Sequence, residues 1–239
     1  MATLLPIITN QAYINFESEY AFRYHFKRQA NWGKVADFGG GIGQKTRKVN
    51  NVTVIDIHEE SIEWMKGHGV EYRTSLVEFD DGAFDLIYCS GTLEHLDEPA
   101  KYLRLMNKKL KVGGKLFLSQ PLDKSVFENT YSEKNGHLYT WTTQQINSLL
   151  RENGFEITEN RTMCFLGIPF ISRHLNGKMR YWDIQNKLME RKTVRKVLYF
   201  WAQTYCLFKE VISETLNSGK YHTETIGTME VWAIKRREK

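Results

Sequence analysis

The sequence predicts an α/β protein with a doubly wound, mostly parallel sheet, and three observations carry that prediction. Short apolar runs alternate with helical patterns from residue 34 to about residue 158, which is the pattern of consecutive βαβ units. A glycine-rich turn follows the first apolar run. With 239 residues, 41% of them hydrophobic and 26% charged, the chain has the composition of a globular protein that buries a full core.

The individual elements follow from apolar spacing and from turn residues. Apolar runs bounded by turns predict strands at Lys34–Phe38, Val52–Ile57, Val70–Thr74, Phe84–Cys89, Lys115–Gln120, Phe155–Asn160 and Thr225–Ile234. Helical spacing and helix-end signals predict helices at Ser18–Trp32, Pro99–Leu110 and from Thr142 or Thr143 to Asn153. The pair Gly113-Gly114 is expected to end the second helix, and Gly154 lies just past the third.

The chain divides into three predicted parts. An N-terminal helical cover takes residues 1–32, and the sheet domain takes residues 33–165 and 222–239. Residues 166–221 are rich in aromatic and basic side chains, and they predict a helical insertion before the last strand. Ligands of open α/β sheets bind at the carboxyl ends of the strands, so this insertion is expected to cover that crevice.

Charge and cysteine content limit the partners and the compartment. Residues 1–159 carry 18 Lys and Arg against 21 Asp and Glu, whereas residues 160–239 carry 15 against 7, for a net charge of +5. The basic C-terminal third favours an anionic partner, or it forms a solvated helix face. The scattered cysteines Cys89, Cys164 and Cys206 predict neither a disulfide framework nor a zinc site. Without a signal-peptide pattern, they predict a cytoplasmic protein.

The most informative segment is Val35–Gly43, an apolar strand that ends in an acid and a glycine turn. Glycines adopt positive φ and let the backbone approach a ligand that any Cβ would push away. Asp56 follows nineteen residues after Asp37, at the end of the next predicted strand, where an acid can accept hydrogen bonds from a ribose diol. The segment therefore predicts a nucleotide-like site at these strand ends.

Two other glycine-loop motifs fit less well. The dinucleotide motif G-x-G-x-x-G fails, because its last glycine would fall on Gln44 or Thr46. The P-loop G-x-x-x-x-G-K-[ST] from Gly39 finds Lys45 and Thr46 in place but meets Gln44 at its second glycine. A nucleotide phosphate site stays open as an alternative. The pattern Asp-x-Gly-x-Gly-x-Gly fits without a mismatch.

That segment resembles the S-adenosylmethionine (SAM) binding motif of the class I methyltransferases, in particular their quinone-biosynthesis-like and small-molecule branch. Further segments resemble the family in the same order: Phe79–Tyr88, Gly91–Pro99, Leu110–Pro121, and His137–Trp141 followed by Gly154-Phe155. Together they cover about residues 33–160. The resemblance implies a Rossmann-like sheet of seven strands with a reversed last strand, SAM as cofactor, and methyl transfer to a small-molecule acceptor such as a sugar, quinone-like or lipid-linked metabolite, with oxygen as the expected target.

The resemblance also assigns the cofactor site. Asp37 would orient the SAM amino group, the alternate glycines would line its methionine part, and Asp56 would hold the ribose. Adenine would lie against Ile57, and the backbone of Ser90 and Gly91 would approach the sulfonium. The cofactor residues implied in this way are Asp37, Gly39, Gly41, Gly43, Asp56, Ile57, Ser75, Ser90 and Gly91.

Two departures from the family accompany these assignments. The helix expected after Gly43 is about one turn shorter than usual. The family often places an acid near Thr74–Leu76 for the adenine amine, and this chain has none there. Ser75 or a backbone carbonyl would substitute for that acid.

The acceptor side rests on two histidines. Methyl transfer from a sulfonium is an in-line displacement, in which orientation alone supplies about 7 to 11 kcal/mol. A hydroxyl acceptor also needs its proton removed, for which His137 is the first candidate and His95 the second; each is otherwise a loop or surface histidine. A further hypothesis is a divalent-metal site at Glu94, His95 and His137, because some family members carry an E-x-x-E-H segment. Gly91 replaces the first acid of that segment here, so no metal ligand is assigned.

Two functions from other classes stay open. A nucleic-acid methyltransferase or binder would use the basic C-terminal third and bind in a salt-dependent way, but no Asn-Pro-Pro-Tyr-type motif is present and we expect no nucleic-acid partner. A noncatalytic SAM-binding module would bind the cofactor without turnover. The apolar run at residues 197–208 is shorter than the ~20 residues of a membrane span, so it predicts a lid helix or a helix lying on an anionic membrane surface. The sequence carries no signal for an oligomeric state.

Overall fold

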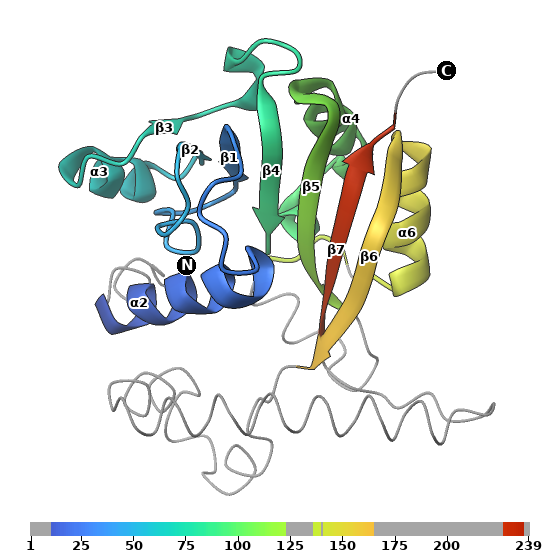
Figure 1. Ribbon diagram of the computed structural model, residues 1–239, viewed down its shortest axis with the longest axis horizontal. Coiled ribbons are helices and arrows are strands. Elements are labelled where there is room, and N and C mark those ends of the chain that lie inside the picture. The colour runs from blue at the N-terminus through green and yellow to red at the C-terminus, as the bar shows by residue number, and fades with distance from the viewer. Residues whose placement is uncertain (1–10, 123–135, 140, 165–226, 237–239) are drawn as a thin grey trace, which may run out of the picture.

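The sheet is the centre of the computed structural model, which describes residues 11–122, 136–139, 141–164 and 227–236 (Figure 1). Within these residues, seven strands form one sheet in the order β3-β2-β1-β4-β5-β7-β6. The strands are β1 (Val35–Phe38), β2 (Val52–Ile55), β3 (Tyr72–Arg73), β4 (Phe84–Ser90), β5 (Leu110–Leu122), β6 (Phe155–Cys164) and β7 (Gly227–Lys235). Strand β7 pairs antiparallel with β5 and β6, and the other pairs are parallel. The predicted α/β class, the seven strands and the reversed last strand are confirmed.

The strand order reverses between β1 and β4. From β1 the chain runs outward to β2 and β3, and it then returns to place β4 on the other side of β1, where Phe38 is in register with Cys89. Loops that leave two such strands in opposite directions leave room for a ligand between them at the carboxyl ends. The topology therefore places the ligand site where β1 and β4 end.

The helices lie around this sheet. They are α2 (Gln11–Tyr20), a π-helical turn η1 (Ala21–His25), α3 (Glu59–Gly67), the 3₁₀ turns η2 (Leu76–Glu78) and η3 (Leu93–His95), α4 (Pro99–Lys109) and α6 (Thr143–Glu152). In Figure 1, α2 lies below the sheet, at the end toward which the β4 arrow points. Thr142, one of the two predicted caps, caps α6 in a reciprocal capping box with Gln145. Every helix in the described part of the chain is too short or too polar to cross a lipid bilayer.

Alternating strand residues build two cores, one on each face of the sheet. On one face, side chains of α4 and α6 pack against the strands; the main members are Leu103, Met106, Ile146, Leu150, Ile87, Leu116 and Val231. On the other face, the segment after α2 covers the strands; the main members are Ala21, Phe26, Val35, Tyr88, Phe117 and Trp232. The N-terminal segment is therefore part of the core of the second face.

That second face also buries a polar group of side chains, which we call the buried triad: His25, Tyr88 and Glu230. His25 Nδ1 lies 2.7 Å from the Tyr88 hydroxyl and His25 Nε2 lies 2.9 Å from Glu230 Oε1. An ionised carboxylate only accepts, so Nε2 carries the proton and Nδ1 accepts from the tyrosine. Arg161 adds an ion-pair contact at 3.7 Å to the second oxygen of Glu230.

The predicted N-terminal helix is wrong in its bounds. The N-terminal helix was expected at Ser18–Trp32, but α2 begins at Gln11, and regular helix ends at Tyr20. The π-helical turn then directs His25 toward the sheet, and Lys27 and Arg28 adopt positive φ of 51° and 61°, which ends helical structure there. Packing on the sheet, which local spacing does not encode, sets these ends.

The second correction concerns the glycines near α4 and β1. Gly113-Gly114 do not end α4, because β5 already begins at Leu110, and its pairing with β4 shifts register near Phe84. After Gly43 there is no regular helix: residues 41–48 form successive turns, with Thr46 N bonded to Gly43 O at 3.2 Å. Positive φ at Gly41 and Gly43 is incompatible with a right-handed helix. The expected helical insertion at residues 166–221 lies outside the described residues.

Candidate functional site

The loops that follow β1, β2 and β4 meet at the carboxyl ends of these strands. Gly39 N donates to Ile55 O at 2.8 Å, which joins the loop after β1 to β2. The Thr92 hydroxyl donates to the carbonyl of Phe38 at 3.3 Å, which joins the loop after β4 to β1. We call the residues gathered here the strand-end site: Asp37, Gly39–Gly43, Lys45, Asp56, Ser90, Gly91 and Glu94.

The predicted glycines adopt the backbone that only glycine takes easily. The φ angles are 69° at Gly39, 58° at Gly41 and 72° at Gly43. A Cβ on Gly39 would lie 2.2 Å from the Thr92 hydroxyl oxygen, so this glycine allows the two loops to pack together. A Cβ on Gly41 would meet nothing nearer than Gln44 Oε1 at 3.5 Å, so this half-buried glycine has space beside its Cα.

Asp37 lies at the end of β1 and is 2% exposed. The Thr46 hydroxyl donates to its Oδ2 at 2.7 Å. Burial raises the pKa of Asp37 to about 6, although the hydrogen bond from Thr46 and the ammonium of Lys45 lower it. A desolvated carboxylate beside a neutral hydroxyl is poised to accept a cation.

Asp56 and Ile57 leave the end of β2. Asp56 Oδ2 accepts from Gly41 N at 2.7 Å and Oδ1 accepts from His58 N at 2.9 Å, so the carboxylate links β2 to the glycine loop. Each oxygen keeps a lone pair for a ligand hydroxyl. Ile57 is 76% exposed, the largest exposed fraction among the exposed large hydrophobic side chains of the described residues, and it offers an apolar surface for an adenine ring.

Ser75 begins the turn η2, where its hydroxyl accepts from Val77 N at 3.2 Å. The sequence showed no acid near this position, but the Glu78 carboxylate folds back and accepts from Thr74 N at 3.0 Å and from Ser75 N at 2.9 Å. Sequence reasoning missed Glu78. Its capping-box spacing, a serine followed three residues later by a glutamate, was the available signal.

Ser90 ends β4, and Gly91 follows it with a φ of 69°. Lys45 Nζ donates to Ser90 Oγ at 2.9 Å, so its ammonium bridges from the glycine loop to the end of β4. Glu17 of α2 lies 3.7 Å from the same ammonium. Sequence reasoning met Lys45 only as a match to the P-loop motif, and it missed Glu17.

Glu94, His95 and His137 lie together, although 42 residues separate the two histidines in the sequence. One ligand atom from each falls within 4.8 Å of the others, and the histidine rings are 4.8 Å apart in an edge arrangement. The backbone holds them there: Leu138 N donates to Glu94 O at 2.8 Å, and His95 Nδ1 lies 3.1 Å from Gly136 O. The fold thus unites both predicted base candidates with the predicted acid.

The electrostatics of this group follow from burial. Glu94 is 2% exposed, and its Oε2 has no hydrogen-bond partner among the described residues. Burial raises the pKa of Glu94 to about 7, while its own backbone N–H and the ammonium of Lys45 lower it. Burial and then the neighbouring His95 hold the pKa of half-buried His137 below its usual value. At neutral pH His137 is therefore an uncharged imidazole.

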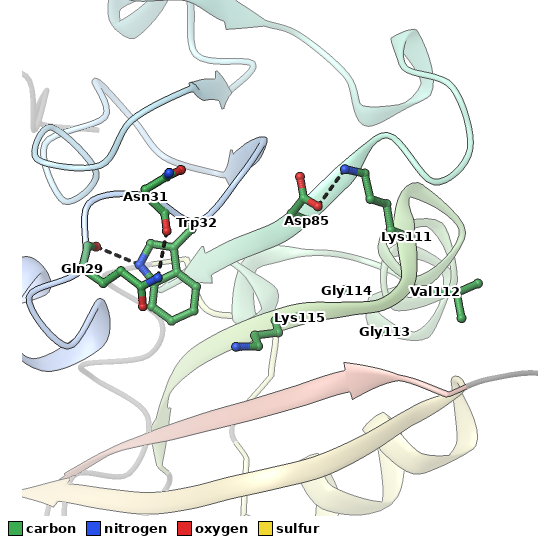
Figure 2. A pocket seen from close by; sticks show the side chains of 9 residues that line it. All are labelled: Gln29, Asn31, Trp32, Asp85, Lys111, Val112, Gly113, Gly114 and Lys115. Atoms are coloured by element: carbon green, nitrogen blue, oxygen red, sulfur yellow. Dashed lines mark hydrogen bonds and ion pairs between the residues drawn. The ribbon is translucent and has the colours of Figure 1, made fainter.

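A cavity of about 320 Å³ lies at the opposite end of the sheet (Figure 2). Its lining includes Trp32, which precedes β1, Asp85 near the amino end of β4, and Lys115 in the first half of β5. Lys111 is paired with Asp85 at 2.7 Å across its edge. None of the strand-end residues lines this cavity, so it is separate from the predicted cofactor site.

Relatives of known sequence match the same part of the chain. A family model described as "Methyltransferase domain" matches residues 17–160. The ubiquinone biosynthesis O-methyltransferase of Xanthomonas oryzae pv. oryzae (strain PXO99A) is 37% identical over 100 residues, which cover 36% of this chain and 42% of that protein. Phosphoethanolamine N-methyltransferase 3 of Arabidopsis thaliana is 28% identical over 155 residues, which cover 56% of this chain and 31% of that protein. The chain thus spans less than half the length of these relatives.

Solved structures share the fold. The [4+2]-cyclase SpnF matches with a TM-score of 0.59 and 18% identity, over 95% of this chain and 82% of that one. Phosphoethanolamine N-methyltransferase 2 of Haemonchus contortus, in complex with phosphomonomethylethanolamine and S-adenosylhomocysteine, matches with a TM-score of 0.57 and 16% identity, over 98% and 60%. At these identities the likeness shows the fold alone.

The family follows from the sequence match rather than from the fold. The matched residues make up more than half of the chain, and they contain the complete strand-end site. This protein therefore belongs to the methyltransferase-domain family, within the class I SAM-dependent methyltransferases that the glycine loop predicts.

Proposed function

We propose that this chain binds SAM at the strand-end site and transfers its methyl group to a small-molecule acceptor, with oxygen as the target. One observation carries the proposal. The buried carboxylates of Asp37 and Glu94 lie near a glycine loop that has space beside the Cα of Gly41, and SAM brings two positive charges, an ammonium and a sulfonium. A buried anion is stabilised when a cation reaches it.

The proposed cofactor contacts follow the chain. Asp37 takes the ammonium, Asp56 takes the ribose hydroxyls, and exposed Ile57 supports the adenine ring. Ser75, with the neighbouring Glu78 carboxylate, faces the adenine amine. The backbone-lined part of the site is formed by Gly39, Gly41, Gly43, Ser90 and Gly91.

The proposed reaction is an in-line displacement. The acceptor oxygen forms a bond to the methyl carbon, the bond from that carbon to sulfur breaks, and the sulfonium becomes the neutral thioether of S-adenosylhomocysteine. His137 takes the acceptor proton, because it is uncharged at neutral pH and half-buried. His95 is the second candidate, and it lies against His137. The relatives named for O- and N-methylation of small molecules support this acceptor class.

The proposed domain arrangement completes the acceptor side. We propose that residues 33–165 and 222–239 form the cofactor domain and that residues 1–32 cover it; the acceptor lid predicted at residues 166–221 lies outside the described residues. Cys89 is a free, buried cysteine, which supports a cytoplasmic location.

The first experiment is calorimetric titration of the full chain with SAM and S-adenosylhomocysteine, with ATP and NAD as controls. Micromolar binding of the first pair, abolished by Asp56→Ala and retained by the exposed control Asp80→Ala, is the expected result. Binding of ATP alone would revive the P-loop alternative. Binding of SAM without turnover on any phenol, catechol or sugar acceptor would favour a noncatalytic module.

A divalent metal at Glu94, His95 and His137 is a second candidate chemistry. The residues fit an ion: Glu94 Oε2 is buried without a hydrogen-bond partner among the described residues, and the Gly136 carbonyl can orient the His95 ring. A bound ion would supply a Lewis acid for an acceptor oxygen. In that case these three side chains hold the ion, and neither histidine is free to take a proton.

Metal titration separates the two chemistries. Calorimetry with Mg²⁺, Mn²⁺ and Zn²⁺ on chelator-treated protein, compared with His137→Ala, reads binding directly and independently of activity. Binding that the variant loses supports the metal site. Full turnover in chelator, together with no heat of metal binding, would contradict the metal site and leave His137 as the base.

A further inference from the structure

The lysine of the unmatched P-loop motif has no role in the function proposed so far. Lys45 Nζ lies at the junction of β1 and β4, where it donates to Ser90 Oγ at 2.9 Å. An ammonium has three N–H donors, and Glu17 at 3.7 Å lies beyond hydrogen-bond length. Lys45 therefore has donors available for a ligand in this place.

The positive charge of Lys45 attracts an anionic group of a ligand. Its ammonium lowers the pKa of both Asp37 and Glu94, so it shares the site with two buried acids. SAM carries one carboxylate beside its ammonium and its sulfonium. With Asp37 on the ammonium, the carboxylate is the one group of the amino-acid part of SAM that a lysine attracts rather than repels.

The neighbouring cations are engaged elsewhere. The Arg47 guanidinium lies over the Trp64 ring, 4.9 Å from its centroid. Lys48 pairs with Glu19 on α2. Lys45 is thus the cation of this loop that reaches the end of β4.

We propose that Lys45 binds the α-carboxylate of SAM and thereby makes the site selective for the intact amino-acid part of the cofactor. This inference rests on the proposed cofactor site. Asp37 would then pair with the ammonium of the amino-acid part, and Lys45 would pair with its carboxylate. The hydrogen bond to Ser90 would hold the lysine in position.

Calorimetric titration of the full chain with SAM and with decarboxylated SAM tests this, because the second ligand lacks only the carboxylate. The wild-type chain is expected to bind SAM more tightly, on the order of tenfold or more, as for a charge-assisted hydrogen bond. Lys45→Met is expected to reduce this ratio to about twofold or less, mainly by weakening SAM. Lys48→Met, the matched control, is expected to keep the wild-type ratio.

Three results would overturn the proposal. An unchanged ratio of the two affinities in Lys45→Met would mean that the SAM carboxylate binds elsewhere. If Lys45→Met instead bound both ligands more tightly and by the same factor, Lys45 would be a cation that competes with the positive charges of the ligands. If Lys45→Met fails to unfold cooperatively by circular dichroism, Lys45→Arg is measured instead, and loss of the ratio in this charge-conserving variant would also contradict it. Failure of the wild-type chain to bind either ligand would overturn the cofactor site itself, which is a distinguishable result.

Discussion

The carboxylates of the strand-end site and of the buried triad are equally buried, but they have different interaction partners. Asp37, Glu94 and Glu230 are each 2% exposed. Glu230 Oε1 lies 2.9 Å from the ring nitrogen of His25, and its Oε2, which makes no hydrogen bond, lies 3.7 Å from the guanidinium of Arg161. Asp37 accepts from a neutral hydroxyl, and Glu94 Oε2 has no hydrogen bond among the described residues, where neither acid has an ion pair. A buried charge is stable only when it is paired. Glu230 therefore has both a hydrogen-bond donor and a guanidinium within the protein, whereas we propose that a ligand brings the cation to the strand-end acids.

The difference also separates stability from function. Removing a member of the triad should unfold the protein without changing what the folded fraction binds. Removing a strand-end acid should do the reverse, because that acid is held in an unfavourable state until the ligand arrives. Four substitutions test this contrast, from the largest effect on stability to the smallest.

His25→Ala is expected to lower the free energy of unfolding by roughly 3 to 5 kcal/mol, because it leaves the Glu230 carboxylate and the Tyr88 hydroxyl buried without their partner. Urea unfolding measures this. The control His68→Ala removes an exposed histidine and should change little. The double variant His25→Phe with Glu230→Met should regain much of the loss. A loss below 1 kcal/mol in His25→Ala would remove the triad's structural role.

Gly39→Ala is expected to cost about 3 kcal/mol, since its Cβ would lie 2.2 Å from Thr92 in addition to the strain of positive φ. Gly113→Ala has a similar φ of 76° and nothing within 4 Å, so it measures the strain alone, about 1 kcal/mol. Gly41→Ala should resemble Gly113→Ala in stability but lose SAM affinity. Equal losses at Gly39 and Gly113 would refute the packing role of Gly39.

Asp37→Asn is expected to stabilise the ligand-free protein by roughly 2 kcal/mol at pH 8 and to abolish SAM binding. Because the pKa of Asp37 is about 6 when folded, the folded state holds a proton that the unfolded state has released. The stability of the ligand-free protein should therefore rise as pH falls from 7 toward 4, and Asp37→Asn should remove this rise. Urea unfolding across this pH range is the measurement.

The same titration predicts the pH dependence of binding. SAM affinity of the wild-type chain should fall as pH drops through about 6, because protonated Asp37 no longer attracts an ammonium. Asp80→Asn, at an exposed position, should preserve both behaviours. Affinity that is constant from pH 5 to 8 would argue against Asp37 as the ammonium partner.

Lys101→Ala should leave the melting temperature unchanged within about 1 °C. Its side chain is 61% exposed and pairs with Glu98 at 2.6 Å on the surface of α4. Water screens such a pair, in contrast to the buried contacts of the triad. A larger shift, measured by differential scanning calorimetry, would mean that surface charges contribute more to this protein than burial suggests.

Much of the fold could be predicted because its signals are local. The strands β1, β2 and β4 follow from apolar runs, and the turn at Gly39–Gly43 follows from a residue type that alone adopts positive φ easily. The cap of α6 at Thr142 is encoded within four residues. The predicted β3 was too long, since only Tyr72 and Arg73 pair with β2 at the edge of the sheet.

The groups that meet across the sheet could not be predicted in this way. Glu17 and Lys45 approach each other only because α2 lies at the strand ends, and the sequence pattern does not encode that placement. The Glu78 side chain bonds back to the Ser75 backbone in a capping box, and a prediction based on apolar runs does not detect this contact. These contacts are polar, and single polar residues leave no periodic signal.

The sequence by itself determined the α/β class, the glycine loop and the two acids at the ends of β1 and β2, because strand periodicity and glycine torsions are properties of neighbouring residues. Only the tertiary structure decided that Glu94, His95 and His137 share one site, that Lys45 reaches Ser90, and that His25 is committed to the buried triad. The physical reason is that turns and packed faces bring distant segments together, and their directions depend on the whole sheet.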